Sequence, residues 1–214
     1  ILLYSRGNDP VEEYLCEHGL LYVVIGKPSE LAKQTICVDN DNLLAGREAT
    51  DYLYNLGHRR IAYLGSRSDF LYAKDRRAGY QLSLLLHQLP NRQDYCIEPE
   101  QLDEECIARL EELLAREDRP TAFVASDDLQ ALALERICVR NGLGVPEDVS
   151  IISFNNSRYT QMLTPRLTTV SVNSYRLGQE AAIQVINHIH EPDLPITRTV
   201  VPHRIIERES CKKV

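Results

Sequence analysis

The sequence lacks the common signatures of catalysis and metal binding. It contains no GxSxG, HExxH, GxGxxG or Walker-type phosphate-binding pattern, so the enzyme classes that these patterns mark are not indicated. Its six cysteines include no CxxC pair, which argues against a zinc ribbon or a redox motif and favours reduced thiols. No apolar run approaches the roughly 18 residues that cross a bilayer. We therefore predict no metal, no cofactor and no membrane segment in these residues.

Positive charge is also scarce. The 214 residues carry 31 acidic and 24 basic side chains, for a formal net charge of -7. A protein that holds a polyanion needs a basic face, so these residues are not expected to grip nucleic acid themselves. With 43% hydrophobic residues, a chain of this length can bury the core of one large domain or two small lobes.

Short β-rich runs recur along the chain and alternate with helical periods. Strands are expected at residues 1–4, 21–25, 35–38, 61–64, 121–125, 150–154, 168–172 and 199–206. The regular alternation of strand and helix predicts an α/β fold with a parallel sheet covered on both faces. Pro202 would remove a ladder hydrogen bond, so the last strand should lie at an edge or be broken there.

Apolar residues three or four positions apart mark the helices between these strands. Gly57 suits the left-handed position at which the first of them stops. The faces expected to be buried are Gly46, Ala49, Leu53 and Leu56 in the first helix, then Ala78, Leu82, Leu85 and Leu89 in the second. Further helices are expected near residues 107–114, 129–141 and 177–189.

Polar residues stand directly after four of the predicted strands. These clusters are Asp39 and Asn40, residues 67–77, Ser126 to Asp128, and Asn155 to Ser157. Ligands of open parallel sheets bind outside the carboxyl ends of the strands, so we expect the clusters to converge on one cleft. The alternative is that each residue only caps the following helix. Arg76 offers a planar fork of donors suited to hydroxyls or a carboxylate, and its alternative is a surface salt bridge.

Several motifs in fixed order resemble those of one known family. They are VDN at 38–40, the pattern from Ala45 to Gly65, RRAGY at 76–80, ASDDLQALAL at 125–134, NGLGVPEDVSIISFNN at 141–156 and TPRLTTVSV at 164–172. Together they resemble the effector-binding core of the LacI/GalR family of transcription regulators, whose fold is shared with type I periplasmic sugar-binding proteins. The resemblance implies a two-lobed α/β fold with parallel sheets between helices and three chain crossings. The expected lobes are residues 1–57 with 175–190, and residues 58–172 with 193–214.

The resemblance also implies roles for individual residues. Arg76 takes the position of the family's effector-clamping arginine, and Ser126 and Asp127 that of its polar pair. Asn155 stands where most members carry an aspartate, and an amide, with donors as well as an acceptor, must read a different hydroxyl pattern. Asp39 and Tyr72 complete the expected effector-binding site.

The expected effector is maltose or a related sugar. SFNNS at 153–157 is similar to the maltose-operon repressor branch of the family. Phe70, Tyr72 and Tyr159 have flat faces on which a pyranose ring can stack, although core packing is the alternative for each and is favoured for Phe70.

The remaining partners are implied by the family as well. Operator DNA would be bound by a helix-turn-helix head upstream of Ile1. The family's first two βα units would also lie upstream, which leaves this chain truncated at its N-terminus. The protein is expected to be a cytoplasmic repressor and a homodimer. The interface residues expected from the family are Ala131, Tyr159, Met162 and Leu163, and Leu163→Asp is predicted to give a monomer.

Two other functions stay open on the sequence alone. An exported sugar-binding protein of a transporter would share the fold, although six scattered cysteines suit an oxidising compartment poorly. An enzyme using Asp127 and Asp128 as an acid and base pair is disfavoured, because adjacent residues at a strand end point in different directions.

Overall fold

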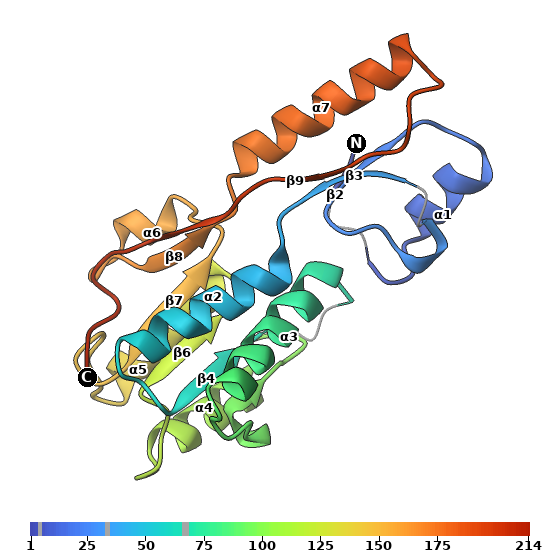
Figure 1. The fold of residues 1–214 in the computed structure, drawn as a ribbon. Helices are drawn as coiled ribbons and strands as arrows, with labels where there is room; N and C mark the ends of the chain where they lie inside the picture. Colours follow the sequence, from blue (N-terminus) through green and yellow to red (C-terminus); the bar gives the residue numbers. More distant parts are fainter. Residues whose placement is uncertain (4–5, 33–34, 66–68) are drawn as a thin grey trace.

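Two separate sheets organise the chain. The computed structural model describes residues 1–3, 6–32, 35–65 and 69–214. Tyr4 of the strand predicted at 1–4, and Arg67 and Ser68 of the polar cluster predicted at 67–77, lie outside the described residues. One sheet has four strands in the order β1-β2-β3-β9, and the other has six in the order β10-β8-β7-β6-β4-β5. We call the parts built on them the four-stranded lobe and the six-stranded lobe (Figure 1).

The four-stranded lobe is the smaller part. Its strands, all paired in parallel, are β1 (Leu2–Leu3), β2 (Val23–Ile25), β3 (Ile36–Asp39) and β9 (Arg198–Val200). Helix α7 (Ser174–His190) packs on β2 and β3 through Leu177 and Ala181, and the short helices α1 (Pro10–Glu17) and η1 (Glu30–Ala32) contact each other.

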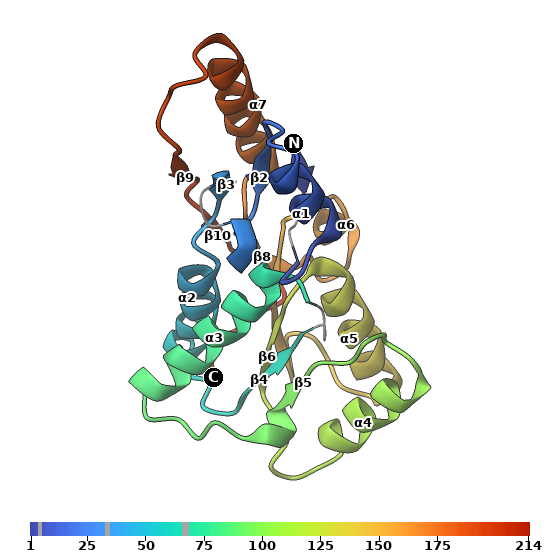
Figure 2. The same ribbon diagram turned by 90° about the vertical axis from the view of Figure 1, so that its right-hand side faces the viewer.

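The six-stranded lobe has helices on both faces of its sheet. Its strands are β4 (Ile61–Leu64), β5 (Cys96–Ile97), β6 (Ala122–Ala125), β7 (Ser150–Phe154), β8 (Thr168–Ser171) and β10 (Arg204–Ile206). The helices are α2 (Asn42–Asn55), α3 (Leu71–Leu86), η2 (Gln93–Tyr95), α4 (Glu104–Leu114), α5 (Asp128–Arg140) and α6 (Tyr159–Met162). Figure 2 shows α2 and α3 on one face of the sheet and α4 and α5 on the other. This arrangement confirms the predicted covered parallel sheet.

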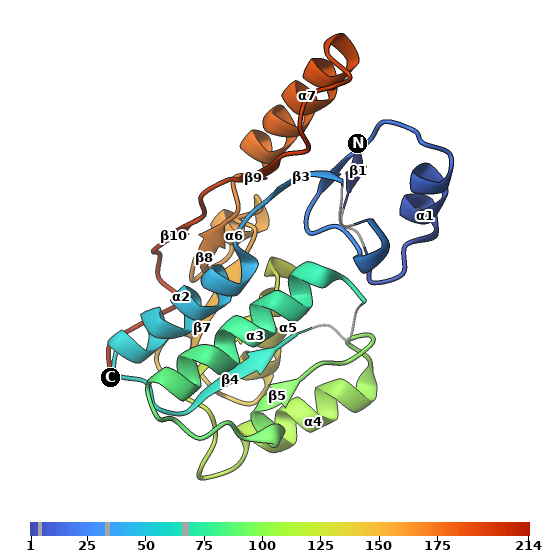
Figure 3. The same ribbon diagram turned by 45° about the vertical axis from the view of Figure 1, so that its right-hand side comes forward.

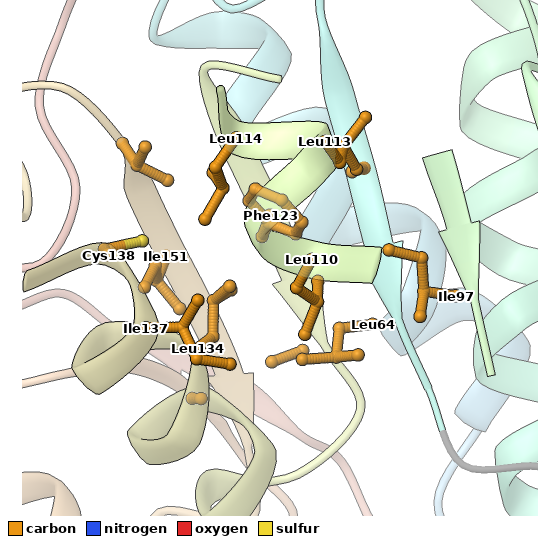
Figure 4. Packing of buried hydrophobic residues seen from close by; sticks show 14 of the residues in the cluster. Leu64, Ile97, Leu110, Leu113, Leu114, Phe123, Leu134, Ile137, Cys138 and Ile151 are labelled. Carbon is orange, nitrogen blue, oxygen red and sulfur yellow. The ribbon is translucent and has the colours of Figure 1, made fainter. Parts of the chain in front are cut away.

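Each face of this sheet has its own hydrophobic core. On the side of α4 and α5, Phe123 of β6 packs among Leu110, Leu114 and Ile151, as Figure 4 shows. On the other side, Tyr63, Tyr80 and Phe154 pack with Leu53 of α2. Strands covered on both faces have no exposed side, which explains why β4, β6 and β7 are apolar or small throughout.

The end of the chain departs from a purely parallel arrangement. Residues 201–203 separate β9 from β10, so the strand predicted at 199–206 is broken at Pro202 as expected. The two halves lie at the edges of different sheets, and β10 pairs antiparallel with β8.

The chain crosses between the lobes three times, after β3, after β8 and after β9. The predicted lobe boundaries, after residue 57 and before residue 193, differ from this arrangement. Helix α2 packs against α3 and the six-stranded sheet, whereas β9 pairs with β3 of the other sheet. The crossings therefore lie near residues 40, 172 and 201, because the chain changes lobe directly after each strand.

Two predictions about local chemistry also have an outcome. The six cysteines are free thiols. Gly57 has a φ of 103°, which confirms the left-handed position predicted at the end of the first helix. Among the described residues, none of the helices combines the length and apolar character needed to cross a bilayer.

Candidate effector site

A cavity of about 350 Å³ lies outside the carboxyl ends of β6 and β7. It is lined by Tyr72, Arg76, Asp127, Asp128, Leu129, Asn155, Ser157 and Tyr159. Three of the predicted clusters thus meet at one edge of the six-stranded sheet, where the carboxyl ends of parallel strands place them.

Arg76 is the central polar group of this site. Its side chain is only 4% exposed, and its guanidinium binds three different elements. Nε donates to Asn42 Oδ1 at 3.0 Å, Nη1 to the Ser126 carbonyl oxygen at 2.8 Å, and Nη2 to Asn155 Oδ1 at 3.3 Å. These bonds use three of the five N–H groups of arginine, which leaves two that can serve a ligand.

Two aromatic rings flank the same guanidinium. Its carbon lies 4.8 Å from the ring centroid of Tyr72 and 4.4 Å from that of Phe154. Both distances suit cation–π attraction, which is strongest for a desolvated cation. Burial lowers the pKa of Arg76, while the nearby Asp127 and Asp39 act in the opposite direction.

Close packing of α2 on α3 places Arg76. A Cβ atom added at Gly46 would lie 2.2 Å from the Arg76 carbonyl oxygen, and one added at Gly79 would lie 2.1 Å from that of Leu43. The two helices run side by side, as Figure 3 shows, and only glycine permits this approach at both positions. The short distance between the two helices brings Arg76 of α3 against Asn42 at the start of α2.

Ser126 and Asp127, the polar pair after β6, both form hydrogen bonds within the protein. Asp127 caps α5, since its Oδ1 accepts from the Gln130 backbone N–H at 2.9 Å, and it also lines the cavity. Ser126 donates its buried hydroxyl to Gln130 Oε1 at 2.6 Å, so its contribution to the site is the carbonyl that accepts from Arg76. The capping alternative is therefore correct for Asp127 without removing it from the cavity.

The loop after β7 has an unusual backbone. Asn155 and Asn156 have φ values of 93° and 52°, a region in which asparagine is tolerated better than most residues. Arg208 stabilises this loop, because its Nη2 donates to Asn156 Oδ1 at 2.6 Å. Asn155 is exposed, so its amide can contact both Arg76 and a ligand.

Asp39 reaches the site indirectly. Its Oδ1 accepts from the backbone N–H of Asn40 at 2.8 Å and from Asn42 Nδ2 at 3.1 Å. Burial raises the pKa of the Asp39 carboxyl to about 6, although these hydrogen bonds and the charge of Arg76 favour its ionised form.

The predicted aromatic residues occupy different places. Tyr72 and Tyr159 line the cavity, and Tyr159 is 56% exposed. Phe70 does not line it. Its ring stacks on Tyr72 at 5.5 Å, and Arg6 of the four-stranded lobe lies over it at 5.1 Å. The packing alternative for Phe70 agrees with this position.

The predicted interface residues differ in exposure. Met162 is 78% exposed, but Ala131 is fully buried in the core beside β6 and cannot contact a partner. Leu163 is half-buried and packs against the same core, so it is less exposed than its expected place in an interface requires. Ala131 faces inward with Leu134 and Ile137 on the side of α5 that packs on the sheet, whereas Leu129 and Val139 are exposed.

Sequence reasoning missed two contributors to the site. Asn42 holds Nε of Arg76, and Phe154 covers the guanidinium face. Phe154 is the last residue of β7 and directly precedes the polar loop, so its place beside the site could have been predicted from the sequence. Asn42 follows the Asp39–Asn40 cluster by two residues, but only the meeting of α2 and α3 reveals its partner.

The two sheets, the three crossings and the polar cavity define a two-lobed α/β protein with a candidate ligand site on its larger sheet. The periplasmic binding protein-like domain family matches residues 50–211. The chain belongs to this family, in the form found in LacI-type transcriptional regulators.

Individual relatives support the same assignment. The chain is 30% identical over 222 residues to the HTH-type transcriptional regulator MalR of Staphylococcus xylosus, covering 100% of this chain and 62% of the relative. It resembles a crystal structure of a LacI transcriptional regulator from Bacillus cereus subsp. cytotoxis NVH 391-98 with a TM-score of 0.91 and 37% identity, covering 100% of this chain and 76% of the other. A CelR–cellobiose complex gives a TM-score of 0.88 and 30% identity, covering 98% and 64%. The chain spans about three fifths of the length of the curated relatives that it matches.

Proposed function

We propose that this chain is the sugar-responsive, effector-binding part of a DNA-binding transcriptional repressor. The observation that carries the proposal is the convergence of Arg76, Asp127 and Asn155 on one cavity beside Tyr72. A buried guanidinium with free donors, an amide, a carboxylate and an aromatic face form the set of groups that recognises a hydroxyl-rich ring.

A disaccharide is the proposed effector. The SFNNS pattern favours maltose, and the solved complex of CelR contains cellobiose, which is also a disaccharide of glucose. Because Asn155 adds amide donors where a carboxylate would only accept, the preferred sugar should offer an acceptor oxygen at this point.

Calorimetry tests this assignment. We expect maltose or cellobiose to bind more tightly than ribose, and Arg76→Ala to weaken binding of the preferred sugar about 100-fold, since bonds from a charged donor are lost. Arg92→Ala is the matched control, because Arg92 pairs with Asp94 and Asp118 on the surface of the same lobe. Unchanged sugar affinity of Arg76→Ala would contradict the proposed site.

The proposed mechanism is allosteric and involves no catalysis. Closure of the two lobes on a sugar would change the spacing of DNA-binding heads in a dimer, and a coupling of about 1 to 3 kcal/mol is enough to alter operator affinity substantially. The heads would belong to a segment outside these residues, and the protein would act in the cytoplasm.

The proposed dimer face lies on α5 and α6. An apolar groove of about 520 Å³ there is lined by Leu132, Glu135, Arg136, Val139, Arg140, Met162, Leu163 and Thr164. Val139 and Met162 in this lining are exposed, and a second copy would remove them from water.

Size-exclusion chromatography tests the dimer face. Met162→Asp is a sharper variant than Leu163→Asp, because Leu163 also packs on the core. We expect Met162→Asp to elute as a monomer and Leu85→Asp to keep the dimer, since Leu85 is 73% exposed on α3. A dimeric Met162→Asp would exclude this face.

The exported sugar-binding protein is the second candidate, supported by the shared periplasmic binding protein-like domain. A band shift of the full-length protein on its own promoter DNA, reversed or strengthened by the sugar, distinguishes the two. Sugar binding without any DNA binding would favour the transporter role.

A further inference from the structure

Asn40 lies where all three crossings between the lobes meet. Its side chain is 6% exposed, and its Nδ2 donates to the carbonyl oxygens of Val172 at 3.1 Å and Val201 at 2.7 Å. These carbonyls belong to the other two crossings, so one amide group joins the three segments. The Val201 backbone N–H also donates to the Asp39 carbonyl at 2.8 Å.

A continuous series of hydrogen bonds leads from this point to the cavity. The Asn40 backbone N–H and Asn42 Nδ2 both donate to Asp39 Oδ1, at 2.8 and 3.1 Å. Asn42, which is 4% exposed, accepts from Arg76 Nε, and Arg76 Nη2 donates to Asn155 Oδ1. Each residue from the crossings to the cavity is thus bonded to the next.

Two of the hydrogen bonds of Asn42 determine the orientation of its amide, and its Nδ2 also donates to the Asn40 carbonyl oxygen at 3.4 Å. A carboxylate oxygen of Asp39 accepts and the guanidinium of Arg76 only donates, so Nδ2 must face Asp39 and Oδ1 must face Arg76. A rotation of the amide by half a turn would break both bonds. Movement of Asp39 with the crossings therefore moves or releases the Nε edge of Arg76.

We propose that Asn40, Asp39 and Asn42 form a positioning relay that couples the relative orientation of the lobes to the direction in which Arg76 presents its donors. The relay adds a positioning role to the proposed effector site, and it rests on the proposed function only for the identity of the ligand. Linkage is reciprocal, so what loosens Arg76 must also loosen the crossings.

Hydrogen exchange of the full chain without ligand tests the relay. The Val201 amide is the reporter, because its bond to the Asp39 carbonyl joins two crossings. We expect Asn42→Ala and Arg76→Ala each to speed exchange of the peptide containing residues 199–203 at least fivefold, although neither residue lies in that peptide. Rates within twofold of wild type for both variants would overturn the relay.

Matched variants separate positioning from a general loss of stability. Asn141→Ala removes an amide bond to the Ile137 carbonyl at the end of α5 and should leave exchange at 199–203 unchanged. Asp39→Asn keeps an acceptor oxygen for both donors and should not exchange faster than wild type, whereas Asp39→Ala should.

Added maltose separates this proposal from the proposed function. In wild type, saturating maltose should slow exchange at 199–203, and in Asn42→Ala it should bind more weakly and, even at saturation, give less than half of that protection. Full protection in Asn42→Ala would overturn the relay. If wild type binds no maltose, the sugar assignment fails while the ligand-free rates still judge the relay.

Discussion

The two lobes differ in how completely their apolar side chains are covered. The largest fully buried side chains, including Tyr63, Tyr80, Phe123 and Phe154, all belong to the six-stranded lobe. In the four-stranded lobe, Leu3, Tyr14 and Ile186 are each more than half exposed, and its main core is a single layer between the sheet and α7.

The cavity follows the same division. All of its lining residues come from the six-stranded lobe. The four-stranded lobe reaches Arg76 through Asp39 and the crossings, and more remotely through Arg6, which lies over the Phe70 ring that stacks on Tyr72. The comparison teaches that the better-packed lobe holds the proposed ligand-contacting groups in place, and that the other lobe is joined to them by the hydrogen bonds of Asp39. Regions with few buried apolar contacts open at lower free energy, which suits a part that moves.

Adding one methyl group in each lobe should produce the largest contrast. Gly79→Ala places a Cβ 2.1 Å from the Leu43 carbonyl oxygen, so α2 and α3 must separate. We expect the free energy of unfolding in urea to fall by about 3 kcal/mol. Gly178→Ala in α7 meets no atom within 4 Å and should instead raise it by about 0.5 to 1 kcal/mol. Similar effects of both changes would contradict the contrast in packing.

The pH dependence of stability should report on Asp39, the link between the lobes. Burial raises the pKa of its carboxyl from 3.8 to about 6, so the folded state binds this proton more tightly than the unfolded chain. This contribution to stability is complete below pH 4 and is lost as the pH rises through 6, by roughly 3 kcal/mol in all.

Asp39→Asn removes this titration. Wild type should lose this contribution between pH 4 and pH 7.5, whereas the variant should not. The free energy of unfolding of the variant minus that of wild type should therefore increase over this range, as measured by urea unfolding at both values. Parallel pH profiles for the two proteins would mean that Asp39 is not buried as described.

The smallest effect is expected at the ion pair between the lobes. Lys27 Nζ lies 3.1 Å from Asp75 Oδ1, but Lys27 is half exposed, so solvent screens the pair. Lys27→Gln should change the free energy of unfolding by less than 1 kcal/mol. A larger loss would show that direct contact, rather than the crossings, holds the lobes together.

Much of the local structure could be predicted from the sequence. The strands at 61–64, 121–125 and 150–154, the stop at Gly57 and the break at Pro202 follow from apolar runs, a left-handed turn residue and a missing N–H. Asn, Asp and Ser after strands also marked the edge at which the cavity lies.

The buried face of α3 was predicted incorrectly. Ala78 and Leu82 are only partly buried and Leu85 is exposed, whereas Arg76, Gly79 and Ser83 face inward with Tyr80 and Leu84. The inner face of this helix meets α2 at very short distance and must accommodate polar and small groups. The spacing of the apolar residues in α3 therefore predicts the wrong buried face for this helix.

By itself the sequence determined the order of strands and helices, the fold class and the set of polar residues at the strand ends, because these depend on local periodicity and turn chemistry. Only the tertiary structure decided where the chain changes lobe, which residues Arg76 contacts, and that Ala131 is buried while Met162 is exposed. These properties arise when segments distant in the chain approach closely, and no local pattern encodes the distance between α2 and α3 or the meeting of three crossings at Asn40.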